Sequence, residues 1–570
     1  MAVIQVENLR YRYPHTEKLA LDGITFSVEK GEFIGIVGEN GAGKSTLSQA
    51  LVGLVPQFYK GAYGGVVTVG GLNGETTPVS KMCSKVGLVF QNPFNQLSGA
   101  RDNVYEEVAF GMQNLGVERE EMKRRMERVL KMLDIWQYRD RNPFDLSGGQ
   151  MQRVAIASIL VMEPEVVILD EPTSQLDPAG SEEVFRAVEK LTRSGITILM
   201  IEQKIEKIAA YCSKVLLLHQ GKQIAFDQPE KVFSLDNLED YGVLPPAFTR
   251  ICRAKGLTNP DGTYPATEEG AAVLFSKDQR EKELKEKKTG QKVHASEQNE
   301  KRGELLNPVF RIDHLTFHYS PESPVLKDLC LNLDRRPTAV IGQNGAGKTT
   351  LVKLLKGLLK PVSGNIFFQG EDIGQKTVAM LAGQVGYVFQ NPDDQIFKYN
   401  VLDEVMFGPL NIGMPQEKAR EEARRALELT GLKDKEMENP YDLELHERKL
   451  VAIASVLAMD TDVIILDEPT IAQDWRGRQI IGGLIRQMSQ KGKLVLAILH
   501  DMDFVAEYFQ RVIVMAHGQI LADGRGDEVF SQKEILEKAC LNPPYVSQLC
   551  SRLGYSGIYL TVEEFLKETT

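Results

Sequence analysis

Short apolar runs alternate along the chain with longer segments in which apolar residues recur at helical spacing. The short runs, which predict strands, are Ile34–Val37, Val166–Leu169, Ile196–Ile201, Ala339–Ile341, Val463–Leu466 and Leu494–Leu499. Segments such as Glu118–Leu133 and Gln416–Thr430 have the helical pattern, as do most of residues 95–160 and 395–455. Buried strands that alternate with helices are typical of a parallel α/β sheet. The pattern therefore predicts a parallel-sheet core with an inserted helical subdomain.

The chain repeats its own sequence. Val154–Ser158 returns unchanged as Val451–Ser455, and Val166–Thr173 returns with one change as Val463–Thr470, each 297 residues later. A Pro-Pro pair also follows in both copies. Self-similarity over this length indicates two similar domains, each with its own small C-terminal extension. The predicted domains are residues 1–275 and 307–570, with extensions near 235–275 and 532–570.

The segment between the two copies, residues 276–306, is rich in charge. It contains nine Lys and Arg and seven Asp and Glu but few apolar residues, too few to bury a core. We expect a flexible linker whose charges keep it solvated and spaced, rather than a site for a partner.

Composition narrows the class of protein. The 570 residues are 42% hydrophobic, which excludes a single small module, and the net charge of −11 argues against a protein that mainly grips nucleic acid. The longest uncharged stretch, Thr377–Pro392, is shorter and more polar than a membrane span. The first ten residues alternate like a strand rather than resembling a signal peptide, and the six cysteines lack metal or redox spacing. We expect a cytoplasmic protein with cysteines of structural role.

Each copy contains a glycine-rich loop between a predicted strand and a predicted helix. Both loops fit the pattern G-x-x-x-x-G-K-[ST], in which backbone N–H groups surround phosphates and the lysine reaches the β- and γ-phosphates. The fold class is therefore α/β, with two tandem P-loop ATPase domains. The predicted ATP-binding residues are Gly38, Asn40, Gly41, Gly43, Lys44, Ser45 and Thr46 in the first copy and Gly342, Asn344, Gly345, Gly347, Lys348, Thr349 and Thr350 in the second.

Two adjacent carboxylates end a later apolar strand in each copy. They are Asp170-Glu171 and Asp467-Glu468. Behind a phosphate-binding loop, the aspartate is placed to hold Mg²⁺ together with Ser45 or Thr349. The glutamate is placed to polarise the attacking water or to accept its proton. These pairs predict ATP hydrolysis with Mg²⁺.

The first copy also contains Leu146-Ser147-Gly148-Gly149-Gln150, with Ser147 placed 23 residues before Asp170. Here the sequence resembles the ATP-binding subunits of ABC transporters, whose signature is LSGGQ, and the resemblance covers nearly the whole chain twice. It implies that Ser147, Gly148, Gly149 and Gln150 contact ATP.

The resemblance assigns further residues to the ATP site. Gln91 and Gln390 match the Q-loop glutamine, which also binds the metal, and His500 matches the switch histidine. Tyr13 and Tyr319 match the aromatic residue that stacks on adenine, although a tyrosine at a strand edge is an alternative interpretation. The implied catalytic residues are Glu468, His500, Gln390 and Glu171, and the implied Mg²⁺ ligands are Ser45, Gln91, Asp170, Thr349, Gln390 and Asp467. The D-loop aspartates are Asp177 and Asp474.

The residues around the Q-loops resemble those of energy-coupling-factor (ECF) and cobalt-type transporter ATPases. The segments are Phe90–Pro93 and Phe389–Phe397, and the Pro-Pro tails are similar as well. In that family the ATPases drive uptake of vitamins or metal ions through a membrane scaffold and a substrate-binding membrane subunit. The resemblance implies ATP and Mg²⁺ as cofactors, membrane-embedded partners that contact the substrate, and a peripheral position on the cytoplasmic face of the cell membrane.

The two copies differ at residues that the family uses. Gln203 occupies the position of His500, and the second signature reads Leu443-Glu444-Leu445-His446-Glu447. In the family two domains dock head to tail, so that each ATP lies between the P-loop of one domain and the signature of the other. Site one would then combine Lys44, Glu171 and Gln203 with the degenerate signature. Site two would combine Lys348, Glu468 and His500 with the intact one, which predicts hydrolysis mainly at site two.

A second class of function fits a twin ATPase. Translation factors that act on the ribosome and DNA-repair proteins also have paired ATPase domains. Those proteins favour basic surfaces, and the translation factors have two intact signatures around a long helical linker. The negative net charge and the lost second signature favour the transporter ATPase.

Overall fold

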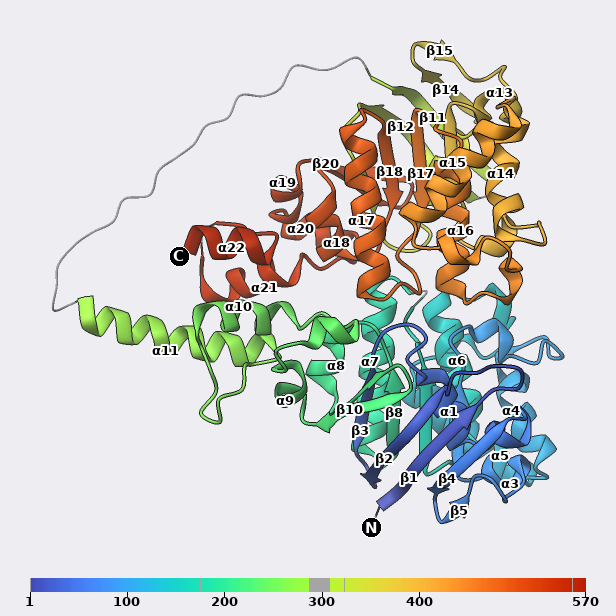
Figure 1. Cartoon of the computed structure of the whole chain (residues 1–570), viewed down its shortest axis with the longest axis vertical. Helices are drawn as coiled ribbons and strands as arrows, with labels where there is room; N and C mark the ends of the chain where they lie inside the picture. Colours follow the sequence, from blue (N-terminus) through green and yellow to red (C-terminus); the bar gives the residue numbers. More distant parts are fainter. Residues whose placement is uncertain (1, 175, 287–307, 322, 556, 570) are drawn as a thin grey trace. The chain divides into compact units, whose positions relative to one another are not determined.

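The computed structural model describes residues 2–174, 176–286, 308–321, 323–555 and 557–569. It divides into two compact units, Met1–Ala271 and Ala272–Thr570. The two halves share most of their succession of strands and helices, and Figure 1 colours the chain along this order from blue to red.

The first half begins with an antiparallel hairpin and ends in helices. Its elements are β1 (Ala2–Arg12), β2 (Leu21–Glu29), β3 (Phe33–Val37), α1 (Lys44–Leu51), α2 (Leu54–Gln57), β4 (Ala62–Val69), β5 (Leu72–Asn73), α3 (Val79–Met82), β6 (Val86–Val89), α4 (Val104–Asn114), α5 (Arg119–Met132), α6 (Gly148–Leu160), β7 (Val166–Asp170), α7 (Pro178–Arg193), β8 (Thr197–Ile201), α8 (Ile205–Tyr211), β9 (Lys214–His219), β10 (Lys222–Asp227), α9 (Pro229–Phe233), α10 (Ala247–Lys255) and α11 (Glu268–Glu286).

The second half follows the same order. Its elements are β11 (Phe310–Ser320), β12 (Ser323–Leu333), β13 (Thr338–Ile341), α12 (Lys348–Leu355), β14 (Ser363–Phe368), β15 (Glu371–Asp372), α13 (Val378–Ala382), β16 (Val385–Val388), α14 (Val401–Asn411), α15 (Gln416–Leu429), α16 (Leu445–Leu457), β17 (Val463–Asp467), α17 (Trp475–Gln490), β18 (Leu494–Ile498), α18 (Met502–Tyr508), β19 (Arg511–Ala516), β20 (Gln519–Gly524), α19 (Gly526–Phe530), α20 (Lys533–Lys538), α21 (Tyr545–Leu553) and α22 (Val562–Thr569).

Each half contains two sheets. The six-stranded sheets have the orders β10-β9-β3-β8-β7-β6 and β16-β17-β18-β13-β19-β20, and they are parallel except for the last hairpin, β9-β10 or β19-β20. This confirms the predicted parallel-sheet core. The four-stranded antiparallel sheets, β2-β1-β4-β5 and β12-β11-β14-β15, were not predicted beyond the strand character of the first ten residues.

The parallel sheet of the first half is buried on both faces. Along β3, Phe33 and Val37 pack into one apolar cluster with helices α4 to α7, whereas Ile34 and Ile36 pack into another with the antiparallel sheet and α1. Side chains of a strand alternate between faces, so a strand covered on both sides is apolar at every position. This explains why the core strands appear in the sequence as continuous apolar runs.

A helical subdomain is inserted between β6 and β7 and between β16 and β17, as predicted. In the second half α14, α15 and α16 pack against one another, and they lie together in Figure 1. Small and apolar residues of α15 form its buried face, including Ala419, Ala423 and Leu427. The subdomain connects the Q-loop at one end to the signature at the other.

Part of the predicted flexible linker is helical. Helix α11 continues to Glu286, so residues 276–286 are helical rather than part of an unstructured tether. The low content of apolar residues led to the wrong prediction here, because helix formation depends on backbone propensity as well as on burial. Residues 287–306 lie outside the described part of the chain. The division into domains at 275 and 307 remains a prediction.

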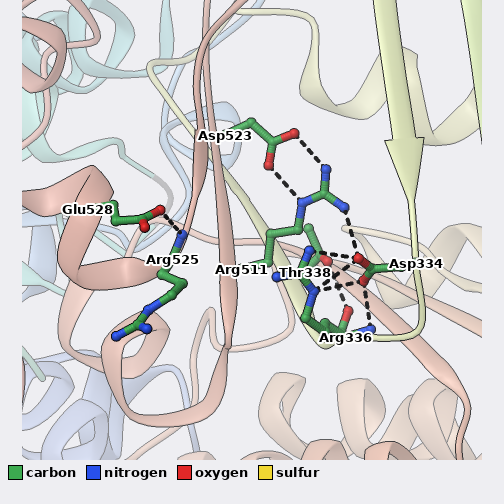
Figure 2. A network of polar contacts seen from close by, with 7 residues as sticks. All are labelled: Asp334, Arg336, Thr338, Arg511, Asp523, Arg525 and Glu528. Carbon is green, nitrogen blue, oxygen red and sulfur yellow. Dashed lines mark hydrogen bonds and ion pairs between the residues drawn. The ribbon is translucent and has the colours of Figure 1, made fainter. Parts of the chain in front are cut away.

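A polar network joins the start of the second half's central strands (Figure 2). The guanidinium of Arg511 on β19 donates to both oxygens of Asp523 at 2.7 and 2.6 Å, and it lies 3.7 Å from Asp334. Asp334 in turn accepts from Arg336, which precedes β13. Burial raises the pKa of Asp334, but the hydrogen bonds and charge of Arg336 outweigh it and lower the pKa. The network links β19 and β20 to the segment that precedes β13.

Replacing Arg511 by Ala is expected to destabilise the second half by about 3 kcal/mol, because two carboxylates would lose their buried partner. The side chain of Arg511 is 9% exposed. Arg525→Ala is a matched control, since Arg525 pairs with Asp527 while 61% exposed and should contribute under about 1 kcal/mol. Chemical denaturation of the two variants measures both effects. Equal destabilisation would contradict the burial argument.

Among the described residues no helix has the length and apolar character that crossing a membrane requires. The six cysteines carry free thiols: Cys212, Cys252 and Cys550 are buried, and Cys83, Cys330 and Cys540 are partly or fully exposed.

Candidate functional site

Each P-loop follows a fully buried strand, β3 or β13, and leads into a helix, α1 or α12. A Cβ atom added to Gly38 would lie 2.2 Å from the carbonyl oxygen of Leu218, and one added to Gly342 would lie 2.1 Å from that of Met515. The chain therefore requires glycine where it leaves the strand. By contrast, a Cβ at Gly41 or Gly345 would meet open space, on the side where a phosphate can approach.

The two P-loop lysines fold over their own loops. Lys44 Nζ donates to the carbonyl oxygens of Gly38 and Glu39 at 2.9 and 2.7 Å. Lys348 Nζ donates to those of Gly342 and Gln343 at 2.7 and 2.9 Å. Both ammonium groups are thus held at the loop, where a triphosphate would replace carbonyl oxygens as their partner.

Among the predicted metal ligands, the hydroxyl and the aspartate lie together in each half, whereas Gln91 and Gln390 hydrogen-bond the adjacent glutamates. The Ser45 hydroxyl hydrogen-bonds Asp170, and Thr349 Oγ1 donates to Asp467 Oδ1 at 3.4 Å. Hydroxyl and carboxylate oxygens are the hard donors that Mg²⁺ prefers, and this ion usually takes its other ligands from phosphates and water. Accordingly, the described residues contain no cluster of three or more His, Cys, Asp or Glu that could hold a metal alone. The donor set therefore fits Mg²⁺ bound with a nucleotide.

The predicted catalytic glutamates contact the predicted Q-loop glutamines. Gln91 Nε2 donates to Glu171 Oε2 at 2.7 Å, and Gln390 Nε2 donates to Glu468 Oε2 at 2.9 Å. Both glutamates also have positive φ angles, 45° and 50°. This backbone conformation is unusual for residues other than glycine and is found at functional sites. In each half, the fold thus brings the residue after β7 or β17 into contact with the Q-loop that follows the neighbouring strand, β6 or β16.

Besides the Q-loop glutamine, a second side chain contacts each glutamate, and its residue type differs between the halves. His500 Nε2 lies 2.9 Å from Glu468 Oε1. Gln203 Nε2 instead donates to Glu171 Oε1 at 2.9 Å and to Asn40 Oδ1 at 3.2 Å. The amide of Gln203 cannot take up or release a proton, whereas an imidazole can do both.

The pKa values of the two glutamates shift in opposite directions. The pKa of Glu171 is raised to about 7, mainly by burial; the charge of Lys44 lowers it, and the nearby carboxylates of Glu202 and Asp170 raise it. Burial also raises the pKa of Glu468, but the hydrogen bond and charge of His500, with Lys348 and Lys449, outweigh it and lower the pKa. Glu468 is therefore the ionised carboxylate at neutral pH, the form that can accept a proton from water.

Three residues of the site were missed by sequence reasoning. Glu202, buried in the first half, accepts from Thr173 at 2.6 Å and corresponds to Leu499. In the second half, Tyr387 donates to Asp467 Oδ2 at 2.9 Å and Lys449 donates to the carbonyl oxygen of Glu468 at 2.5 Å. A position-by-position comparison of the two copies beyond the known motifs would have found all three.

The predicted adenine-stacking tyrosines lie beside the P-loop helices. Tyr13 Oη is 3.1 Å from Thr46 Oγ1, and Tyr319 Oη is 3.4 Å from Thr350 Oγ1. Tyr319 is 65% exposed, so its ring is open to a ligand. The stacking role remains a prediction.

Both signatures begin a helix of the helical subdomain. Ser147 caps α6 by accepting from the backbone N–H of Gln150 at 3.4 Å, and the Gln150 side chain accepts from the N–H of Ser147 at 3.2 Å. Glu444 caps α16 in the same reciprocal way with Glu447. The degenerate signature thus keeps the start of its helix but replaces a serine and an amide by two carboxylates.

The two sheets, the P-loops and the paired carboxylates define the chain as a P-loop ATPase with two ATPase domains. A model of the family described as ABC transporter matches residues 21–174 and 326–471. A Methanosarcina acetivorans protein named as an ABC transporter ATP-binding protein is 37% identical over 568 residues, which cover 97% of this chain and 91% of its own length. A protein of Caldanaerobacter subterraneus with the same description is 37% identical over 572 residues, 99% of this chain and 98% of its own.

The chain belongs to the ABC transporter family and is an ATP-binding protein with two ABC ATPase domains. Among solved structures, cbiO1 of Clostridium perfringens, described as part of the ABC transporter complex cbiONQ, is similar with 35% identity and a TM-score of 0.37. The match covers 41% of this chain and 94% of that one.

Proposed function

We propose that this chain is the energy-coupling ATPase of an ECF-type importer for a vitamin or a metal ion, and that it hydrolyses ATP at one of two unlike sites. The proposal of hydrolysis at one site rests on the contact of Glu468 with both His500 and Gln390. In the first half, Glu171 has Gln203 in place of the histidine and is close to a further carboxylate, Glu202. The ECF assignment rests on the Q-loop segments and the Pro-Pro tails.

In the proposed arrangement the halves dock head to tail around two ATP molecules. Site two unites Lys348, Glu468 and His500 with the signature that begins at Ser147. Site one unites Lys44 and Glu171 with the signature that begins at Glu444. There, two carboxylates would face the triphosphate, and like charges repel. Site one therefore binds nucleotide with little turnover.

The mechanism at site two follows from the contacts. Lys348 moves its ammonium from the loop carbonyls to the β- and γ-phosphates, and Gln390 and Glu468 hold the attacking water. Glu468 accepts the proton of that water while His500, hydrogen-bonded to the same carboxylate, orients it and contacts the γ-phosphate. Thr349 and Asp467 would hold Mg²⁺, which would supply positive charge to offset that of the phosphates. Loss of the γ-phosphate removes contacts between the halves, which then part.

Exposed aromatic residues beside the Q-loops give the membrane partner a place to bind. In the first half Phe94 and Phe144 stack with ring centroids 5.9 Å apart, although both are more than 40% exposed. In the second half Phe397 and Tyr399 follow the Q-loop and are 52% and 87% exposed. Apolar side chains that remain exposed together are typical of a protein–protein contact. We propose that a membrane-embedded scaffold subunit covers them, which places the chain on the cytoplasmic face of the membrane.

Co-purification from the native cell tests this function. The tagged chain is expected to be recovered from detergent-solubilised membranes with hydrophobic subunits in fixed proportion. Phe94→Ser combined with Tyr399→Ser should reduce that recovery about tenfold, since two exposed anchors are lost, while ATP binding is unchanged. Recovery with ribosomes or nucleic acid, and none with membrane proteins, would contradict the proposal and support the second class of twin ATPase.

A further inference from the structure

Two departures of the second half from the first lie on either side of the loop that carries Glu468. Lys449 lies on α16, just after the degenerate signature, and Gln473 lies between β17 and α17, just after the catalytic carboxylates. At the same spacing of 297 residues, the first half has Gln152 and Leu176. Both second-half residues are polar and buried, with exposed fractions of 3% and 2%.

Lys449 contacts the backbone of the proposed catalytic residue. Its Nζ donates to the carbonyl oxygen of Glu468 at 2.5 Å. Glu468 has a φ angle of 50°, a backbone conformation that is unfavourable for a residue with a side chain. A charge-assisted hydrogen bond to this carbonyl holds the peptide plane after Glu468 and so limits how its side chain can turn.

Gln473 makes a second contact between the same two segments, from the loop to α16. Its Nε2 donates to the carbonyl oxygen of His446, inside the degenerate signature, at 2.9 Å. The loop that carries Glu468 is thus tied to α16 at two points, from the helix to the loop and from the loop to the helix.

The first half lacks both ties. Leu176 packs into the apolar core, and Nε2 of the buried Gln152 has no hydrogen-bond partner in the described structure. The carbonyl oxygen of Glu171 accepts from the N–H of Ser174 at 3.2 Å, where the corresponding bond from Ile471 to Glu468 is longer, 3.4 Å. The turn bond is thus present in both halves, and in the second half Lys449 is a further donor to the same carbonyl oxygen.

We propose that Lys449 and Gln473 form a brace that positions Glu468 for hydrolysis, so that the second half's signature helix supports the catalytic loop of its own half. The brace rests on the proposed function, in which Glu468 carries turnover. Lys449 and Gln473 are positioning residues, since they act through Glu468. The degenerate signature then has a role of its own.

A buried ammonium group is costly, and this cost provides the test. Burial lowers the pKa of Lys449 to about 8. Methionine has a similar shape without the charge, and apolar replacement of a buried charge is often neutral or stabilising. Lys449→Met is therefore expected to lower kcat about tenfold with KM for ATP within about twofold, while Tm stays the same or rises. Gln152→Met, the matched change in the first half, should leave kcat within about twofold.

Steady-state phosphate release by the full chain measures kcat and KM, and thermal unfolding measures Tm. Gln473→Leu, which introduces the first half's residue, should also lower kcat without lowering Tm. An unchanged kcat in either Lys449→Met or Gln473→Leu would overturn the brace, as would a loss of kcat that accompanies a lower Tm. Glu468→Gln, assayed beside them, separates the two proposals. If Glu468→Gln still turns over ATP, the proposed function fails; if it is inactive while Lys449→Met is fully active, the brace alone fails.

Discussion

Glu468→Gln is expected to abolish ATP turnover by the purified chain, with a loss of at least about 100-fold. Glu468 is the ionised glutamate that contacts both Gln390 and His500. An amide keeps the size of the side chain and its hydrogen bonds, but it cannot accept a proton from water. Phosphate release at saturating ATP and Mg²⁺ measures the loss.

Nucleotide binding provides the control for this variant. Lys348 and the P-loop are unchanged in Glu468→Gln, so the chain should still bind ATP with an affinity within a few-fold of the wild type. Removal of the proton acceptor traps intact ATP at site two. A variant that keeps more than a tenth of the wild-type rate would show that another group accepts the proton.

Ser147→Glu is expected to lower turnover about 100-fold, although it changes a residue of the first half. In the proposed pairing Ser147 faces the triphosphate held by Lys348, so a carboxylate there would repel the γ-phosphate. The start of α6 should survive, because Glu444 caps α16 with a glutamate in the same position. The loss would thus be electrostatic rather than a failure to fold, and an unchanged Tm would verify this.

The reciprocal change, Glu444→Ser, is the matched control for the pairing of the halves. It removes one carboxylate from site one and should leave steady-state turnover within about twofold, because Glu171 and Gln203 limit that site. If Glu444→Ser changed the rate as strongly as Ser147→Glu does, the assignment of each signature to the opposite P-loop would be wrong.

The motifs predicted most of the site because their requirements are local. Gly38 must be glycine where the chain passes the carbonyl of Leu218, and a lysine must follow at the start of the helix. Likewise, buried strands require continuous apolar residues, and in both copies one such strand ends in an aspartate, Asp170 or Asp467. Such constraints act within a few residues of the chain, so they can be recognised without the fold, and the parallel core was predicted from them.

The remaining parts of the site depend on contacts between distant segments. Glu202 acts on Glu171 from the neighbouring strand, Tyr387 reaches Asp467 from another, and Lys449 reaches Glu468 from the helical subdomain. No local pattern distinguishes a buried lysine that bonds a carbonyl from an exposed one. The sequence also failed to predict the helix at the start of the linker. The charged composition predicted a flexible tether from residue 276, whereas the structure has a helix as far as Glu286.

The asymmetry of the two sites is the central claim, and turnover by Glu171→Gln measured beside Glu468→Gln tests it most directly. Glu171 has Gln203 in place of a histidine, and its pKa of about 7 leaves it partly protonated at neutral pH. We expect Glu171→Gln to keep at least about half of the wild-type rate and Glu468→Gln to lose at least about 100-fold. Equal losses in the two variants would contradict it.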